Sequence, residues 1–395
     1  MKRRKRTEKP NLNHLIICLG YQTLDLKPIF LNGSSTQYNL CASDSESLSF
    51  NELLEISREE DKALLDNMSF GYTETYGDKK LREIIASLYE DSSYKDILTF
   101  SGAEEAIYIS MKSILDKDDH AIVFSPNYQS AQTLPQSICD VTVLNLNPNE
   151  EWNINLDQLK SSIKKNTKLI SINFPHNPTG KIISRSDQNE IIKICRENNI
   201  YLFSDEIYRM MERDISKRLP QVSDLYEKGI SLNGMSKSYG MPGIRMGWVN
   251  SKDHKLLDIM ERMKHYLSIC NSAPNEILTI MALNSRDKIL ERANTIIRKN
   301  LTELNKFFND HKELFSWKEP DGGCIAYPKY LGSDGVENFC EKLIKENSVL
   351  LLPSSVYLSV NKNGPKNHFR IGFGRKNMTS ALRELEKFVN NNYSF

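Results

Sequence analysis

The stretch Ser231-Leu-Asn-Gly-Met-Ser-Lys237-Ser-Tyr-Gly-Met-Pro-Gly-Ile-Arg245 places a lysine in a turn of small residues, directly after a strand-like run. Small neighbours let the backbone and a bound molecule approach each other closely. A lysine removed from water has a lowered pKa and can form an imine with a carbonyl compound. Arg245 lies eight residues further on, where it can return to the turn and neutralise an anion. An exposed loop lysine is the ordinary alternative for Lys237.

A second candidate residue, Asp205, follows the run Ile200–Phe203, which is typical of a β-strand. The carboxyl ends of strands in open α/β sheets are where ligands bind. A partly buried carboxylate at such an edge needs a cationic partner or hydrogen bonds. A protonated pyridine nitrogen is such a partner, and its charge makes the ring an electron sink. The alternative is an aspartate that caps a helix, with Glu206 in the first turn.

The region around these two motifs alternates between short β-rich runs and helical runs, which predicts crossover units and a mostly parallel sheet. The β-rich runs are Ile97–Phe100, Ala121–Phe124, Val141–Leu146, Leu169–Phe174, Ile200–Ser204, Gly229–Leu232 and Met246–Val249, and the helical runs are Leu81–Tyr89, Ala103–Leu115 and Asp187–Glu197. Long helical runs follow Lys252, and then a second α+β pattern, with strand-like runs at Gly323–Tyr327, Val349–Leu352 and Phe369–Phe373.

The change of pattern predicts how the chain divides into domains. We expect a large domain at residues 61–270 and a small C-terminal domain at residues 271–395. Residues 1–60 are polar and without a regular pattern, and we expect them to form an N-terminal arm and part of the small domain.

Four further motifs lie beside predicted strands. Asn177 begins an Asn-Pro-Thr-Gly turn, and its amide can donate to an anionic oxygen on a ring. The loop Gly102–Ala106 offers the free backbone amides of a helix N-terminus, which bind phosphate. Tyr128 can stack on a heteroaromatic ring, and Arg370 in a β-rich run can bind a carboxylate through two hydrogen bonds. Each motif also has an ordinary structural alternative. Asn177 can belong to a plain turn, Gly102–Ala106 to a strand–helix connection, Tyr128 to packing in the core or at its rim, and Arg370 to a structural ion pair.

Composition excludes several classes of protein. The formal net charge of +1 over 395 residues gives no overall attraction to nucleic acid or anionic membranes. Seven scattered cysteines, without a C-x-x-C motif or a Cys/His cluster, predict reduced thiols and no metal site. No stretch approaches the ~20 apolar residues of a membrane span. We expect a soluble, cytoplasmic protein whose basic hexamer at residues 1–6 is a solvated tail.

Taken together and in order, these motifs resemble the class I/II aminotransferases, which are pyridoxal-5′-phosphate (PLP)-dependent enzymes of fold type I. The resemblance runs from about Asn39 to Phe388 and includes the pattern Tyr72-x4-Gly77-x3-Leu81-Arg82. Two stretches, Asn173–Gly180 and Ser236–Trp248, also resemble capreomycidine-synthase-type relatives. The resemblance implies an α/β fold of the PLP-dependent transferase type, with a mostly parallel central sheet in the large domain and a smaller α+β domain.

The resemblance also implies a role for each matching residue. Lys237 forms an internal aldimine, a Schiff base, with PLP and then carries a proton between Cα and C4′. Asp205 keeps the pyridine nitrogen protonated, and Tyr208 binds the 3′-oxygen of the ring together with Asn177. The other implied contacts are stacking by Tyr128, phosphate binding by Ala103, Glu104, Ser236 and Arg245, binding of a neighbouring subunit's phosphate by Tyr72, and binding of the substrate α-carboxylate by Arg370 and Asn177.

The implied reaction transfers an amino group from an L-amino acid to a 2-oxo acid, in a homodimer with shared active sites. Motifs common to the class leave open a PLP-dependent lyase or a capreomycidine-synthase-like cyclase on the same fold. A PLP-fold regulator or silent paralogue is disfavoured, because Lys237 and Asp205 are both present and the polar arm is too short for a DNA-binding domain. The near-neutral charge disfavours a nucleic-acid protein that uses the basic tail.

Two departures from the family pattern affect what the resemblance implies. Many relatives carry a hydroxyl residue three positions before the lysine, where this chain has Gly234, so one phosphate contact is absent. The relatives' glycine segment that gates the substrate is not recognisable, and Cys41-Ala-Ser-Asp-Ser-Glu-Ser lies in its neighbourhood. The preferred substrate side chain therefore does not follow from the resemblance.

Overall fold

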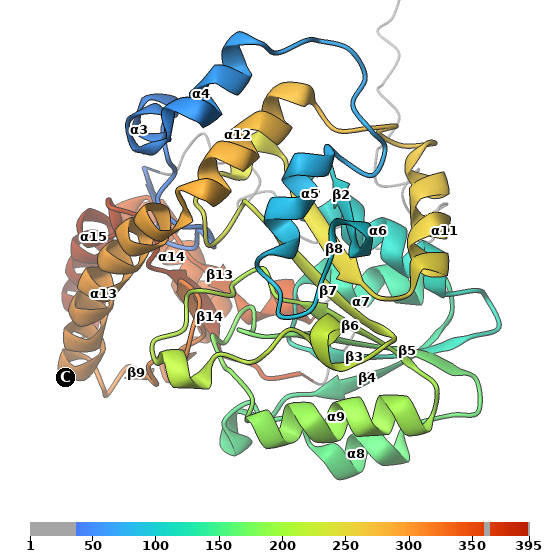
Figure 1. The fold of residues 1–395 in the computed structure, drawn as a ribbon. Coiled ribbons are helices and arrows are strands. Elements are labelled where there is room, and N and C mark those ends of the chain that lie inside the picture. Colours follow the sequence, from blue (N-terminus) through green and yellow to red (C-terminus); the bar gives the residue numbers. More distant parts are fainter. Residues whose placement is uncertain (1–36, 359–363, 394–395) are drawn as a thin grey trace, which may run out of the picture.

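The computed structural model describes residues 37–358 and 364–393. The basic hexamer and the rest of residues 1–36 of the predicted arm lie outside the described residues. Among the described residues, no helix is both long and apolar enough to cross a membrane. A central sheet with helices on both faces occupies one part of the molecule, and a group of long helices, α13 to α15, lies beside it (Figure 1).

The central sheet has seven strands in the order β2-β8-β7-β6-β5-β3-β4. In chain order they are β2 (Ile97–Phe100), β3 (His120–Ser125), β4 (Asp140–Asn145), β5 (Thr167–Asn173), β6 (Tyr201–Asp205), β7 (Gly229–Gly234) and β8 (Gly247–Ser251). Strand β8 is antiparallel to both β7 and β2, and all the other neighbouring pairs are parallel. The carboxyl ends of six strands therefore lie on one edge, and this edge carries the loops of interest.

Helices cover both faces of this sheet, because successive strand residues point to opposite sides. On β8, Trp248 packs into a cluster with helices α5 (Lys79–Ala86) and α12 (Ala273–Asn284), whereas Val249 packs on the other face. The second face is covered by α6 (Ala103–Ile114), α7 (Gln129–Gln136) and α11 (His254–Lys264), and the first also by α8 (Leu156–Ser161), α9 (Arg185–Glu197) and α10 (Val222–Leu225). Helices therefore shield both faces of the sheet from water, as is typical of parallel sheets.

The C-terminal part forms a separate hydrophobic cluster. Its helices are α13 (Arg286–Asp310), α14 (Val336–Asn347) and α15 (Met378–Asn392), and its strands are β9 (Phe315–Ser316), β10 (Ile325–Ala326), β11 (Lys329–Tyr330), β12 (Val349–Leu350), β13 (Leu352–Pro353) and β14 (Phe369–Gly372). The first described strand, β1 (Tyr38–Asn39), pairs in parallel with β12. This pairing anchors the segment that follows β1 to the C-terminal part and leads it toward the edge of the central sheet.

The structure confirms the predicted fold class, an α/β fold with a mostly parallel central sheet. The expectation that the arm is irregular up to residue 60 is wrong for its last part, where α3 (Phe50–Ile56) and α4 (Glu59–Asp66) form. Ser49 and Glu52 make a capping box at the start of α3, and α4 packs on the distant α12. A sequence pattern does not display such a long-range contact. The domain boundaries at residues 60 and 270 stay predictions.

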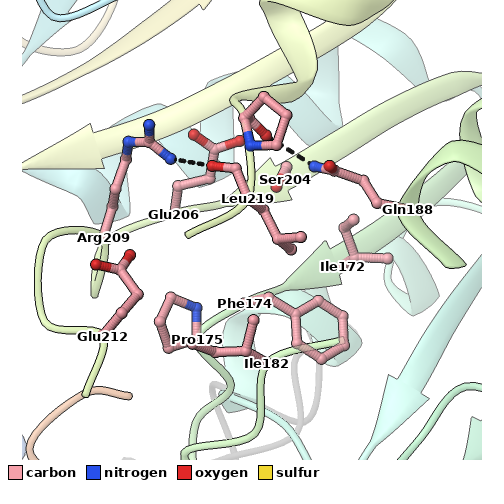
Figure 2. A pocket seen from close by; sticks show the side chains of 11 residues that line it. Ile172, Phe174, Pro175, Ile182, Gln188, Ser204, Glu206, Arg209, Glu212 and Leu219 are labelled. Carbon is pink, nitrogen blue, oxygen red and sulfur yellow. Dashed lines mark hydrogen bonds between the residues drawn. The ribbon is translucent and has the colours of Figure 1, made fainter. Parts of the chain in front are cut away.

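A small cavity of about 20 Å³ lies beside β6 on the face that carries Ile172 and Ser204 (Figure 2). The buried side chain of Glu206 lines it. The Oε1 atom of Glu206 accepts hydrogen bonds from the Ser231 hydroxyl (2.9 Å) and the Val222 amide (3.2 Å), but Oε2 has no hydrogen-bond partner among the described residues. Burial raises the pKa of Glu206 to about 7, because it penalises the charged carboxylate.

We predict that Glu206 makes the stability of the cofactor-free protein depend on pH. Because its pKa is raised on folding, its contribution is complete below pH 4.5 and is lost as the pH rises through 7. In the wild type, Glu206 should therefore lower the unfolding free energy by roughly 2 kcal/mol as the pH rises from 5 to 8. In Glu206→Gln this decrease should be absent. Urea denaturation at several pH values measures this change.

The control is Glu190→Gln on α9, a partly exposed carboxylate whose pKa is lowered by a hydrogen bond from Lys160. Glu190 titrates below pH 4.5, so its removal should leave the slope between pH 5 and pH 8 unchanged. Equal slopes for the wild type and Glu206→Gln would show that Glu206 does not titrate in this range.

Candidate active site

A cavity of about 200 Å³ opens at the carboxyl edge of the central sheet. The structure brings together in it every predicted cofactor-binding residue except Tyr72: Ala103, Glu104, Tyr128, Asn177, Asp205, Tyr208, Ser236, Lys237 and Arg245. They come from the ends of β2, β3, β5, β6 and β7 and from the loops that follow. Motifs spread over more than 140 positions thus meet in one cavity, because parallel strands end at the same edge.

Lys237 lies in the turn that follows β7, with its amine in the cavity. Nζ donates a hydrogen bond to Ser43 Oγ at 2.9 Å. Burial lowers the pKa of Lys237, and the positive charge of Arg370 lowers it further. A glycine is required at position 234, because a Cβ atom there would lie 2.9 Å from the carbonyl oxygen of Met246. The close packing of β7 on β8 therefore explains the missing hydroxyl residue at Gly234.

Asp205 is the last residue of β6, one strand away from the lysine turn. Its Oδ1 accepts a hydrogen bond from the Ile207 amide at 3.1 Å, and Asn173 Nδ2 donates to its carbonyl oxygen at 2.8 Å. Burial raises the pKa of Asp205 to about 6, even though this amide bond opposes the rise. A carboxyl group with so few partners gains from a cationic ligand beside it.

The N-terminus of α6 and Arg245 form the cationic end of the cavity. Gly102 caps α6 with a φ of 100° and provides no side-chain cap, so the first amides of the helix stay free to bind an anion. A Cβ atom on Gly102 would lie 2.4 Å from Arg245 Nη2. Glu104 does not compete for these amides, because its Oε1 accepts from the Ser130 hydroxyl. This end of the cavity suits a phosphate group.

Arg370 on β14 reaches the site from the C-terminal part of the chain. Its Nε and Nη2 donate to the Cys41 carbonyl oxygen at 3.2 and 2.9 Å, and its Nη1 donates to Asn177 Oδ1 at 3.4 Å. Within the described residues, no carboxylate pairs with this guanidinium group. A cation without a counter-ion next to the cavity is suited to a carboxylate of a ligand.

Ser43 is a lining residue that the sequence analysis missed. Its carbonyl oxygen accepts a hydrogen bond from the Tyr208 hydroxyl at 2.9 Å, and its side chain meets Lys237. The segment is fixed by Asp44, which makes a two-oxygen ion pair with Arg375 at 2.9 Å. No sequence signal identifies Ser43, because the contact joins residues 194 positions apart.

Tyr72 does not line this cavity, and its side chain is 88% exposed. The nearby Thr73 hydroxyl donates to the carbonyl oxygen of Asn271 at 3.0 Å, which holds the loop at the surface. The predicted role of Tyr72 toward a neighbouring subunit stays a prediction.

Comparison with known proteins identifies the family. The family model for aminotransferase class I and II matches residues 35–385, so the chain belongs to this family. A probable aspartate aminotransferase of Methanocaldococcus jannaschii is 29% identical over 326 residues, which are 80% of this chain and 84% of that protein. Capreomycidine synthase of Streptomyces vinaceus is 26% identical over 311 residues, 78% of each chain. A PLP-dependent aminotransferase structure from Streptococcus suis 89-1591 superimposes with a TM-score of 0.86 at 27% identity, covering 95% of this chain and all of that one.

The chain is therefore an aminotransferase, and PLP is its cofactor. The cavity fits this molecule at both ends. The close approach of Gly102 to Arg245 leaves a cradle for the phosphate that any Cβ would fill. Among the described residues the buried Asp205 carboxyl forms no ion pair, and a protonated pyridine nitrogen would provide one. The amine of Lys237 lies in the same cavity, as attachment to an aldehyde requires.

We predict that Gly102→Ala weakens PLP binding by about tenfold, because the methyl group displaces Arg245 and costs roughly one charge-assisted hydrogen bond. A titration of the cofactor-free protein with PLP, followed by absorbance, measures the dissociation constant. The matched control is Gly335→Ala. Gly335 caps α14 with a φ of 81° and has nothing within 4 Å of its added Cβ.

Both substitutions place alanine at a positive φ, which costs on the order of 1 kcal/mol of stability. Only Gly102→Ala should also change the affinity for PLP. If Gly335→Ala weakens binding equally, backbone strain and not the cradle accounts for the effect.

Proposed function

We propose that this chain transfers an amino group from an L-amino acid to a 2-oxo acid, with Lys237 as the catalytic base and Asp205 and Tyr208 as its partners. The observation that carries the proposal is the shared cavity of Lys237 and Asp205, which come from neighbouring parallel strands. When bound, PLP supplies an aldehyde that takes up the amino group and a ring that accepts the electron pair from Cα.

Lys237 would take the proton from Cα of the substrate. Its lowered pKa supports this role, because a larger fraction of the amine is neutral and can accept a proton near neutral pH. Asp205 would hold a proton on the ring nitrogen by pairing with it, and Tyr208 would donate its hydroxyl hydrogen bond to the 3′-oxygen together with the Asn177 amide. Tyr128 at the rim of the cavity would stack on the ring.

Arg370 would bind the α-carboxylate of the amino acid, with Asn177 beside it. The contacts of Arg370 leave its charge uncompensated, and two of its nitrogens are already held by Cys41. The cationic end formed by Ala103, Glu104, Ser236 and Arg245 would hold the cofactor phosphate. The substrate is thereby fixed at one end by Arg370 and at the other by the cofactor, which orients the Cα–H bond toward Lys237.

A second outcome on the same residues is elimination or cyclisation. The similarity to the capreomycidine synthase of Streptomyces vinaceus favours keeping this alternative. Both outcomes begin with removal of the Cα proton, so the residues that line the cavity do not distinguish them. The products do, because amino transfer releases a 2-oxo acid without ammonia.

We also propose that the active unit is a homodimer. Several large apolar side chains are exposed on two loops of the described chain: Phe70 (86%), Tyr72 (88%), Tyr266 (88%) and Leu267 (51%). The hydrogen bond from Thr73 to Asn271 ties these loops together. Burial of this surface against a second copy would bring Tyr72 to the partner's phosphate site, and it would explain why an aromatic residue of the motif lies outside its own cavity.

We further propose a cytoplasmic location and a division into an arm at residues 1–60, a large domain at 61–270 and a small domain at 271–395. The six described cysteines carry no disulfide, which supports a reducing compartment. The separate hydrophobic cluster around α13, α14 and α15 supports a C-terminal unit of its own.

We predict that the PLP-loaded protein, mixed with single L-amino acids and no 2-oxo acid, forms up to one equivalent of 2-oxo acid per active site. The substitution Lys237→Ala should slow exchange of the Cα hydrogen with deuterated water by about 10³-fold, because the catalytic base is lost. Mass spectrometry of the amino acid measures the exchange. The control, Lys228→Ala, removes a partly exposed lysine outside the cavity, whose Nζ lies over the Tyr201 ring.

Lys228→Ala should keep the exchange rate within about twofold. If the reaction releases ammonia and the amino group is not retained on the enzyme, the reaction is an elimination and amino transfer is rejected. Unchanged exchange in Lys237→Ala would reject the role of Lys237.

We predict that Ser43→Ala lowers kcat about five- to tenfold with little change in KM, because the hydroxyl that positions the free amine of Lys237 is lost. The kinetic isotope effect of Cα-deuterated substrate on kcat should rise, since proton transfer becomes slower relative to the other steps. The matched control is Ser45→Ala, which removes a fully buried hydroxyl that has no hydrogen-bond partner among the described residues. A lower melting temperature without a change in the isotope effect would assign Ser43 a structural role only.

A further inference from the structure

A second cavity, of about 210 Å³, lies on the other side of the lysine turn. Eleven residues line it: Ser87, Leu88, Tyr89, Arg209, Met210, Arg218, Gln221, Asn233, Tyr239, Trp248 and Arg286. They come from the end of α5, the loop after β6, the start of α10, the lysine turn, β8 and the start of α13. None of the eleven is acidic, although three are arginines. The proposed amino transfer uses none of them.

One of these three arginines forms an ion pair among the described residues, and a second, Arg209, lies near Glu206, whose pKa its charge lowers. Arg218 pairs with Glu212, Nε to Oε2 at 2.8 Å. Arg209 and Arg286 have no carboxylate within 4 Å among the described residues. Their hydrogen bonds go to main-chain oxygens, from Arg209 to Leu219 and from Arg286 Nη1 to Leu283 at 3.2 Å. Figure 2 shows the hydrogen bond from the Arg209 guanidinium to Leu219, both of which also line the small cavity beside Glu206.

Uncharged donors complete the lining. Gln221, Asn233 and Tyr239 are buried, with 3%, 6% and 3% of their surface exposed. The Gln221 amide, the Asn233 Nδ2 group and the Tyr239 hydroxyl make no hydrogen bond within the described part of the chain. Since these polar atoms are accessible from the cavity, a molecule bound there can accept their hydrogen bonds. Burial raises the pKa of Tyr239 to about 12; the charges of Arg286, Arg209 and Arg218 oppose this rise, and the charge of Asp287 adds to it.

We propose that this cavity is a binding site for a small oxyanion, a phosphate or a carboxylate, held by Arg209, Arg286 and the Tyr239 hydroxyl. Guanidinium groups bind the oxygens of such anions through paired hydrogen bonds. An anion compensates two partly exposed cationic groups that form no ion pair among the described residues, and it also satisfies the three uncharged donors. A cation or an apolar ligand does neither.

The site is connected to the catalytic turn. Tyr239 is two residues after Lys237, and Asn233 is four residues before it. Between them, the Ser238 hydroxyl contacts the carbonyl oxygens of Ile207 at 3.1 Å and Arg209 at 2.6 Å. A bound anion therefore bridges the lysine turn and the segment that carries Tyr208, and it stabilises their relative position. An anion that binds only the folded state also raises the melting temperature.

The test is isothermal titration calorimetry of the PLP-loaded protein with inorganic phosphate and, in a separate arm, with malonate, at constant ionic strength. Loading fills the phosphate end of the active site, so binding there is prevented. We expect saturable binding of at least one anion. Because malonate can also bind at Arg370 in the active site, binding is assigned to this cavity only where Arg286→Gln weakens it, and the tighter of the anions so assigned identifies the source. Arg286→Gln should weaken this binding by about tenfold or more, because a charged hydrogen-bond donor is lost.

The matched control is Arg298→Gln on the same helix, an exposed arginine that pairs with Glu291 at 2.7 Å. It changes the net charge equally and should keep the affinity within about twofold. If Arg286→Gln does not fold, Tyr239→Phe takes its place as the test variant. It removes only a hydroxyl that has no partner in the described chain, and it should weaken anion binding about threefold to tenfold. Absence of saturable binding, or equal affinity in the wild type, Arg286→Gln and Tyr239→Phe, would overturn the proposal.

Discussion

The structure depends on the burial of two ionisable groups at the ends of neighbouring parallel strands. Asp205 ends β6 and Lys237 follows β7, and both lie in one cavity. Burial pushes the two pKa values in opposite directions, up for the carboxyl group and down for the amine, so each group is held closer to its neutral form. A ligand with a ring nitrogen beside Asp205 and an aldehyde beside Lys237 gives each of these side chains a partner, and PLP has both groups.

The same cavity is closed by a segment from a distant part of the chain. Residues 40–46 run between the central sheet and the C-terminal strands, because β1 pairs with β12 and Asp44 pairs with Arg375. This segment brings Ser43 to Lys237 and to Tyr208, and it brings the Cys41 carbonyl oxygen to Arg370. Lys237, Tyr208 and Arg370, proposed as the base, the ring-binding residue and the carboxylate-binding residue, are thus held by two residues near the start of the described chain, Cys41 and Ser43.

Arginines without a carboxylate partner are grouped around the lysine turn. Arg245 lines the cavity that fits the cofactor, Arg370 contacts its lining residue Asn177, and Arg209 and Arg286 line the cavity behind the turn. A guanidinium group that lines or adjoins a cavity and has no ion pair among the described residues is stabilised by an anion beside it. Both cavities are therefore prepared for anions. The first cavity fits PLP, the cofactor of the family to which the chain belongs. The second cavity is linked to the first through Ser238 and Tyr239.

The sequence alone determined the strands of the central sheet, the fold class and the motif residues that line the cavity, because each depends on local pattern: a β-rich run, a turn of small residues, and a polar residue where a strand ends. It did not determine α3 and α4, the contacts of Ser43, or the donor-rich cavity around Tyr239. Those depend on residues far apart in the chain, such as the 194 positions between Ser43 and Lys237. Only tertiary packing brings such residues together, and therefore the structure was required to find them.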